Sequence, residues 1–513
     1  MGEVTVPAMF LLVWAAVIIL IGVLGELLSR RTGVPEAVWL IGAGAVLALT
    51  TGEGGWARFS PYVQFIAVPA VVLVFFESGT RVKFAEMGGN ASRAVLLAAV
   101  GCVFSLLAVA AAVQLAAGSG FLPANWGWVN SLTLGAGLAA PGYPLLATAM
   151  GKAAADRRVG IFLGVESALA DVMCLLAVIL FGRLALGDGA GMTLKACGLG
   201  LAMGAAVGAI WILFLKAMRS SPHAYPMALA VAILLYAAAE RFGGSGPFAV
   251  LGAAVVLGNA SGIGTALKLG GGFDLPEDAK GYRSQTAALV RIFLLTFSGF
   301  VLAGGGALSG SAPASPHAIL LGAGLAVILL AVRWGAVETA SRGSGLDEVQ
   351  RRLLKVAFPR GLAPVALVLL PVMDGVAGAD AAVPVAYSAV FVSMLIFAAW
   401  FPAMRRGLGL PGSLYAAGDM RRLAPVSSVA AYRPAMTASI GGYANAGDAQ
   451  CIAQTPLAPT NSYSSQPSAL PMASEPVALF DPLPPLDDPA PHHRNTVRPD
   501  DPDEIKPGSG FHW

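Results

Sequence analysis

The sequence has few charged residues for its length. Only 12% of its 513 residues are Asp, Glu, Lys or Arg, whereas 56% are hydrophobic, and the mean hydropathy is +0.72. Soluble domains carry about 25% charged residues. The deficit argues against a soluble globular protein and predicts a chain that crosses a membrane several times.

Cysteine, histidine and net charge are also scarce. The four cysteines are scattered without a Cys-x-x-Cys pair, and the five histidines show no metal-binding spacing. We therefore expect no disulfide framework, no resident metal and no cofactor. A net charge of +3, without interleaved aromatic and basic residues, gives no indication of nucleic-acid binding.

Apolar runs separated by short polar turns fill the first 404 residues. A helix needs about 20 apolar residues to cross a bilayer, so we predict an all-α polytopic membrane protein with about thirteen transmembrane helices. The expected spans are residues 6–28, 36–51, 62–78, 92–117, 129–150, 158–186, 193–217, 224–240, 245–262, 285–305, 316–337, 359–373 and 383–404.

The loop charges test this count, because cytoplasmic loops are enriched in Lys and Arg. Most basic residues follow odd-numbered spans, and few follow even-numbered ones. The alternation predicts an N-terminus outside and a C-terminus in the cytoplasm, with the protein in the cell (inner) membrane. The residues after odd spans are Arg30, Arg31, Arg81, Lys83, Arg93, Lys152, Arg157, Arg158, Lys216, Arg219, Lys268, Lys280, Arg283, Arg342, Arg351, Arg352, Lys355, Arg405 and Arg406.

The composition changes near residue 407. Residues 407–513 are rich in Pro, Ser, Ala and Asp and show no helical or strand periodicity, which predicts a disordered cytoplasmic tail. We therefore divide the chain into a transmembrane domain, residues 1–406, and this tail. The tail could be dispensable, or it could bind a cytoplasmic partner that the sequence does not identify.

Two acidic residues interrupt the apolar segment 159–181. Carboxyl groups near the bilayer midplane cost a few kcal/mol each and usually serve ion or proton passage. Ser167 and Asp171 are four residues apart and share a helix face, so they could offer oxygen ligands to a small hard cation. Glu166 lies about 140° from Asp171 and is expected to pair with an arginine. That pairing is a structural role, which we favour for Glu166 and keep as the alternative for Asp171.

Two arginines in apolar runs could be buried partners. Arg291 begins a long apolar run, and Arg360 follows Pro359 in what we expect to be a broken helix lining a cavity. Arg333 is expected at the membrane interface, with its stem in the apolar region and its charge in water. Glu77 ends the third span and is either an interfacial acid or part of the ion path.

The fifth span contains Pro141, Gly142 and Pro144 within four residues. Neither proline can donate a helical hydrogen bond, so the segment should unwind in the membrane. Such a break could serve packing alone. Beside a helix that carries Asp171, however, an unwound segment is how many transporters build an ion site.

Six motifs in the same order resemble the NhaP-type sodium/proton antiporters of the monovalent cation/proton antiporter-1 (CPA1) family. They are FFESG (75–79), LGAGLAAPGYP (134–144), GVESALAD (164–171), SGPFAVLGAAVVLGN (245–259), LVRIFLLTFSGF (289–300) and FPRGL (358–362). The resemblance covers about residues 6–404. It implies two inverted six-helix repeats with broken crossed helices, and elevator-like alternating access in a homodimer surrounded by membrane lipid.

The resemblance also implies a cation site. By motif matching, Asp171 would bind the cation or the proton, with Ser167 and Glu77 as auxiliary ligands. Gly142 and Tyr143 would contribute from the unwound segment.

Three further residues would have electrostatic roles by the same matching. Glu166 would form a structural ion pair with Arg360, and Arg291 would supply charge compensation.

The sequence departs from the family pattern at two places. The usual Thr-Asp-Pro is Gly142-Tyr143-Pro144, so a backbone carbonyl would replace the acidic side chain, and Tyr143 or Glu77 would have to face Arg291. The usual Asn-Asp pair is Ala170-Asp171. A single acid argues against the two-carboxylate electrogenic type.

These expectations combine into antiport by competition at one carboxylate. Burial disfavours the charged form of an acid, so either one H⁺ or one monovalent cation would neutralise Asp171 and let it cross. We expect Na⁺, with K⁺ or Li⁺ as alternatives, electroneutral exchange, and a role in pH homeostasis. The alternative is a transporter-derived sensor or regulator that binds cations without turnover. A channel is disfavoured, because nothing resembles a selectivity filter.

Overall fold

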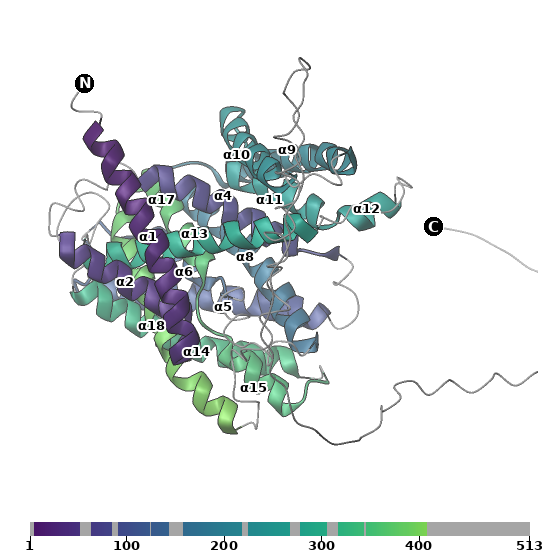
Figure 1. The fold of residues 1–513 in the computed structure, drawn as a ribbon. Helices are drawn as coiled ribbons and strands as arrows, with labels where there is room; N and C mark the ends of the chain where they lie inside the picture. The colour runs from purple at the N-terminus through teal and green to yellow at the C-terminus, as the bar shows by residue number, and fades with distance from the viewer. Residues whose placement is uncertain are drawn as a thin grey trace, which may run out of the picture. The chain divides into compact units, whose positions relative to one another are not determined.

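The computed structural model describes residues 5–51, 63–84, 91–123, 125–142, 157–217, 224–266, 277–304, 316–342 and 345–407. Within these ranges the chain forms helices and no strand (Figure 1), which confirms the all-α class. Tyr143 and the tail from residue 408 onward lie outside the described ranges. The predictions made for them therefore stay predictions.

The helices follow the apolar runs of the sequence, and every predicted span overlaps at least one of them. Their bounds are α1 (Thr5–Thr32), α2 (Glu36–Thr51), α4 (Val63–Arg81), α5 (Ala91–Gly118), α6 (Trp128–Ala139), α8 (Arg157–Ala185), α9 (Ala190–Ala217), α10 (Ala224–Arg241), α11 (Gly246–Gly258), α12 (Ala260–Ala266), α13 (Glu277–Gly304), α14 (Pro316–Ser341), α15 (Glu348–Val356), α16 (Leu362–Leu367), α17 (Leu369–Met373) and α18 (Ala379–Gly407).

The membrane character of the chain is visible in the helix lengths and surfaces. Eight described helices are long and apolar enough to cross a bilayer, and the bent pair α11–α12 would make nine. The count of thirteen spans therefore stays a prediction. Large apolar side chains such as Leu49 (73% exposed) and Leu115 (79% exposed) lie on the surface. Soluble monomers rarely expose large apolar patches, whereas an integral membrane protein presents such side chains to lipid.

Helix contacts divide the described helices into two groups. One group, termed the α8 bundle, comprises α5, α6, α8, α14, α15, α16, α17 and α18, which pack mainly on one another. The other, termed the α4 bundle, comprises α1, α2, α4 and α9 to α13. Figure 1 shows α9, α10 and α11 gathered in the second group. Across the boundary, α4 and α9 pack on α8, and α13 packs on α16 and α18.

Glycines allow close helix crossings in the α4 bundle. A side chain on Gly44 would collide with the Thr296 carbonyl oxygen, and one on Gly299 would collide with that of Ile41. Helices α2 and α13 therefore pack backbone to backbone. Small residues are common at membrane helix crossings, because association there depends on close van der Waals packing.

A bend of 64° separates α11 from α12, and Asn259 lies at the break. The Asn259 side chain accepts a hydrogen bond from the Phe84 amide at 2.8 Å and donates one to the Val82 carbonyl at 2.7 Å. These two bonds attach the chain that leaves α4 to the rest of the α4 bundle.

Two interrupted segments cross inside the α8 bundle. The first leaves α6 at Ala140 in an extended conformation, and the second leads into α16 at Leu362. At the crossing, the Gly142 amide donates to the Pro359 carbonyl at 3.0 Å. A carbon added to Gly142 would lie 2.5 Å from the Gly361 nitrogen, so the segments meet backbone to backbone. The predicted broken, crossed helices are confirmed for the described residues.

Candidate functional site

Asp171 lies on α8 at the boundary between the two bundles. Its side chain is only 2% exposed. Oxygen Oδ2 accepts a hydrogen bond of 2.6 Å from the Ser78 hydroxyl and lies 3.3 Å from Nη2 of Arg81. The same Nη2 donates to the Ser78 hydroxyl at 2.8 Å, so the hydroxyl accepts from the arginine and donates to the acid. The carboxylate of the α8 bundle thus meets a hydroxyl and a guanidinium of α4.

The second carboxylate oxygen of Asp171 is buried and has no hydrogen-bond partner among the described residues. An ionised carboxylate has about four acceptor positions, and leaving them unused in a buried site is costly. A proton or a small cation at this oxygen would relieve that cost.

Ser167 faces the unwound segment that follows α6. Its hydroxyl points toward the Pro141 carbonyl oxygen at 3.5 Å, longer than the usual 2.5–3.0 Å for O–H···O bonds. Ser167, Pro141 and Gly142 are all buried, and Ser167 lies one turn before Asp171. The predicted oxygen donors of α8 and of the unwound segment therefore lie beside each other. Tyr143, which is predicted to contribute from the same segment, lies outside the described ranges.

Glu77 faces a different direction from its neighbour Ser78. It lines a small cavity between α4, α10, α13 and α16, with Thr80 and Tyr225 among its walls. One Glu77 oxygen lies 3.7 Å from Nη1 of Arg81, and its side chain is 35% exposed. Among the described residues, Glu77 therefore has Arg81 as its charge partner.

Arg291 forms an ion pair within the α4 bundle. Its Nη2 lies 3.4 Å from a carboxylate oxygen of Glu36, and both residues belong to the α4 bundle. The charge compensation expected of Arg291 near the crossed helices stays a prediction, because this ion pair does not test it. The counter-charge in contact with Asp171 is Arg81, because α4 rather than α13 faces this side of α8.

Glu166 pairs with Arg333 rather than with Arg360. The two side chains form a bidentate ion pair, in which Nη2 of Arg333 lies 3.0 Å from Oε2 of Glu166. The Nε of Arg333 also donates to the Leu354 carbonyl at 2.9 Å. With 6% exposure, Arg333 is a buried residue, and the expected position at the membrane interface is wrong. Its helix, α14, contributes to the interior of the α8 bundle and directs the charge toward α8.

Arg360 has a different role at the crossing. Its Nη1 donates to the Ala139 carbonyl at 2.7 Å and its Nη2 to the Ser105 hydroxyl at 3.2 Å. Ala139 ends α6, and the C-terminal carbonyls of a helix carry partial negative charge that a cation stabilises. The predicted pair Glu166–Arg360 is thus replaced by two separate functions, an ion pair for Arg333 and a helix cap for Arg360.

The sequence pattern does not identify Ser78 and Arg81 as the residues that contact Asp171. The loop charges account for Arg81 only as a cytoplasmic basic residue. The available signal was its spacing: Ser78 and Arg81 are three residues apart and share a helix face. That spacing could not show that the face meets Asp171, which lies 90 residues further along the chain.

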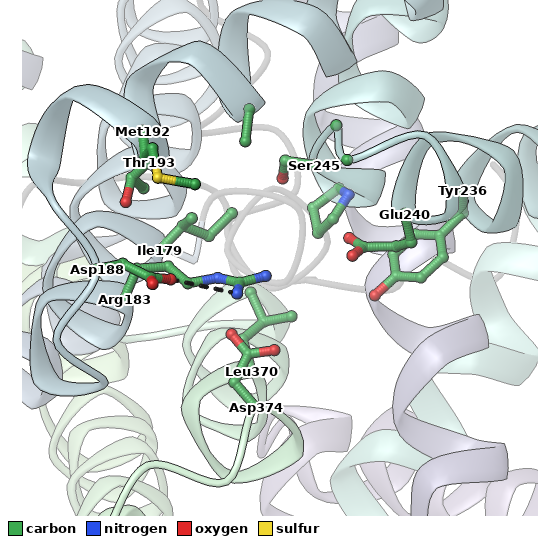
Figure 2. Close-up of a pocket in the computed structure, with 14 residues that line it drawn as sticks. Ile179, Arg183, Asp188, Met192, Thr193, Tyr236, Glu240, Ser245, Leu370 and Asp374 are labelled. Carbon is green, nitrogen blue, oxygen red and sulfur yellow. Dashed lines mark hydrogen bonds and ion pairs between the residues drawn. The ribbon is translucent and has the colours of Figure 1, made fainter.

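A cavity of about 210 Å³ lies at the same boundary toward the other end of α8. Figure 2 shows Arg183 joined to Asp188 by an ion pair, with Glu240 and Asp374 also on the wall. Partial burial raises the pKa of Asp374, which follows α17, and the Arg183 charge opposes the rise. Arg183 is twelve residues from Asp171, or roughly 18 Å along a helix, so this cavity is separate from the carboxylate.

Within the described ranges, no three His, Cys, Asp or Glu side chains gather in a way that could hold a metal ion. The oxygen donors around Asp171 suit a transported alkali cation, which is a substrate and not a resident metal.

Comparisons with known proteins address the family and the fold of the chain. The family model for the transmembrane domain of sodium/hydrogen exchangers matches residues 15–406. The structure of the sodium proton antiporter MjNhaP1 from Methanocaldococcus jannaschii at pH 8 superposes with a TM-score of 0.60 at 16% identity, covering 77% of this chain and all of that one. An electron-microscopy structure of MjNhaP1 gives 0.58 at 16% identity, covering 80% of this chain and 99% of that one.

The structural likeness shows that the chain has the fold of this antiporter, as its motifs predicted. The family match extends over most of the chain and defines it as a secondary transporter in a membrane, one that works without a cofactor. The chain belongs to the sodium/hydrogen exchanger family.

Proposed function

We propose that the chain exchanges Na⁺ for H⁺, one for one, at Asp171. The observation that carries the proposal is the buried carboxylate at the bundle boundary, of which one oxygen lacks a partner among the described residues. A neutral site crosses a low-dielectric region at far lower cost than a charged one. Binding of either Na⁺ or H⁺ therefore lets the Asp171 site cross the membrane. Because the two ions compete for this site, the Na⁺ flux is coupled to the H⁺ flux.

The cation would be held by oxygen atoms from both bundles. Asp171 supplies a carboxylate oxygen, and the Ser78 hydroxyl lies 2.6 Å from it. The Ser167 hydroxyl and the Pro141 carbonyl lie one turn away. These neutral oxygens add no charge, so the single carboxylate supports electroneutral exchange. K⁺ and Li⁺ use the same ligand type and remain alternatives to Na⁺.

The bundle division favours alternating access by movement of one bundle against the other. The α8 bundle carries the carboxylate and the interrupted segments, and the α4 bundle supplies the opposing surface. We propose that the α8 bundle moves, in a homodimer in the inner membrane with the N-terminus outside and the C-terminus in the cytoplasm. The loop charges support this orientation.

Asp171→Asn tests the site directly. The amide cannot exchange a proton for a cation, so we expect Na⁺-driven proton movement in proteoliposomes to fall by at least a hundredfold while the protein keeps its fold. Each of Na⁺, K⁺ and Li⁺ is supplied in turn to the wild type, which identifies the cation. Glu348→Gln, at an exposed position on α15, is the matched control and should exchange at the wild-type rate.

Retained exchange in Asp171→Asn would contradict the proposal. The sensor alternative predicts a different pattern, in which the wild type binds the cation, as seen by thermal stabilisation, yet moves no protons with any of the three cations.

A further inference from the structure

The ion pair between Asp171 and Arg81 joins the two bundles. Asp171 belongs to α8, and its guanidinium partner belongs to α4, at a distance of 3.3 Å. The buried ion pair between Glu166 of α8 and Arg333 of α14 lies wholly within the α8 bundle. A relative movement of the bundles would therefore break the first pair and leave the second intact.

Arg81 is firmly attached to its own bundle. The chain that follows it, Val82–Phe84, is fixed by two side-chain hydrogen bonds of Asn259 at the α11–α12 bend. Gly79 packs so closely on α11 that an added carbon would lie 2.9 Å from the Leu251 carbonyl oxygen. The guanidinium cannot follow α8 over any distance without loss of these contacts.

Arg81 has a second carboxylate within reach on its own helix. Its Nη1 lies 3.7 Å from Glu77, whereas its Nη2 contacts Asp171. Its Nε is buried and has no hydrogen-bond partner among the described residues. The guanidinium is thus shared between two acids, and the loss of one leaves it near the other.

We propose that Arg81 locks the two bundles together while Asp171 is empty and ionised. A proton or a cation at Asp171 removes the attraction, Arg81 turns to Glu77, and the α8 bundle is free to move. This inference rests on the proposed function and adds the device that stops the empty carrier from crossing. It assigns Arg81 and Glu77 as positioning residues, outside the set of groups that bind the ion.

The lock has two measurable consequences. Arg81 competes with the transported cation for Asp171, so its removal should tighten cation binding. It also prevents return of the empty ionised site, so its removal should allow Na⁺ to move without a counter-ion. Such movement carries net charge, whereas one-for-one exchange carries none.

Arg81→Gln tests both consequences in the full-length protein. Na⁺ affinity is read from thermal stabilisation of the purified protein at alkaline pH, with choline chloride keeping the ionic strength constant. We expect the midpoint Na⁺ concentration to fall about tenfold, a value between those for an exposed and a buried ion pair. In proteoliposomes with a thiocyanate diffusion potential, inside negative, ²²Na⁺ uptake should rise severalfold for this variant only.

Two controls keep the test specific. Arg81→Lys retains the charge and should resemble the wild type, and Arg352→Gln removes an arginine whose i, i+4 pair with Glu348 lies within α15. Glu77→Gln should weaken Na⁺ binding severalfold, because Arg81 then has only Asp171 as a partner. The lock is overturned if Arg81→Gln matches Arg352→Gln in both measurements, or if Glu77→Gln binds Na⁺ as tightly as the wild type. These results do not depend on the Asp171→Asn experiment. Retained exchange in Asp171→Asn would overturn the proposed exchange site, whereas the Arg81 and Glu77 variants test only the lock.

Discussion

Asp171 and Glu166 lie five residues apart on α8, yet each carboxylate meets a different arginine on a different helix. Their directions differ by about 140° around the helix, so Glu166 points into the α8 bundle and Asp171 points at α4. The Glu166 pair is bidentate and closed off from the boundary. The Asp171 pair leaves one carboxylate oxygen unused. Glu166 is therefore paired through both oxygens within one bundle, whereas Asp171 keeps one oxygen for the ion that we propose it binds.

Arg333→Ala tests the structural role of the Glu166 pair. The substitution leaves Glu166 as an unpaired buried charge, which costs about 3–5 kcal/mol, and we expect a clear fall in thermal stability in detergent. Glu166→Ala should behave similarly, and the double variant should lose less than the sum of the two, because the partners are coupled.

Arg352→Ala, at an exposed position, is the control and should change the stability by less than about 1 kcal/mol. Additive losses in the double variant would show that the two residues do not stabilise the fold as a pair.

At the scale of helices, the crossing of the interrupted segments positions the site. The backbones of Gly142 and Gly361 meet where α6 has ended and α16 has not begun. Arg360 satisfies the last carbonyl of α6 at Ala139, so the interruption does not leave that carbonyl unpaired in the membrane. The same interruption exposes the Pro141 carbonyl toward Ser167, beside Asp171.

Gly361→Ala tests this crossing. The new methyl carbon would lie 2.7 Å from the Gly142 α-carbon, closer than real side chains approach, so the segments must separate. We expect a loss of about 1–3 kcal/mol of stability and at least a tenfold lower exchange rate in proteoliposomes. Gly335→Ala is the matched control, because a side chain at Gly335 of α14 meets no atom within 4 Å. Equal behaviour of the two variants would rule out a tight crossing.

At the scale of the whole molecule, the main feature is the boundary at which the α8 bundle faces the α4 bundle. The Asp171 site and the 210 Å³ cavity both lie between α8 and helices of the α4 bundle. The loop charges assign the ends of these helices to opposite sides of the membrane. If the bundles move along this boundary, as we propose, the side of the membrane from which ions have access to Asp171 would change.

The orientation can be tested by cysteine labelling in intact cells. We expect a membrane-impermeant maleimide to label Asp188→Cys, between α8 and α9, but not Glu348→Cys on α15, because the first follows an even span and the second an odd one. Both variants are made with Cys451 replaced, since Cys102, Cys174 and Cys197 are buried. Labelling of Glu348→Cys without cell lysis would invert the predicted topology.

The helical class, the interrupted segments and the importance of Asp171 as a buried acid could be predicted from local sequence. Apolar length predicts a span, paired prolines predict a break, and an acid in an apolar run is conspicuous because its burial is costly. The partners of the acids could not be predicted in this way. Arg291, Arg333 and Arg360 all lie in apolar runs, and nothing in their spacing distinguishes a partner of Glu166 from a helix cap.

Hydropathy and helical periodicity act over a few turns, so the local sequence predicts that this chain enters the membrane as helices and that α8 carries an acid, Asp171, within an apolar run. The packing of the helices, in contrast, establishes that Arg81 faces Asp171, that Arg333 pairs with Glu166 and that Arg360 caps α6. Those pairings depend on how each helix is rotated against its neighbours. Contacts between residues far apart in the chain set that rotation, so it cannot be predicted from a local sequence pattern.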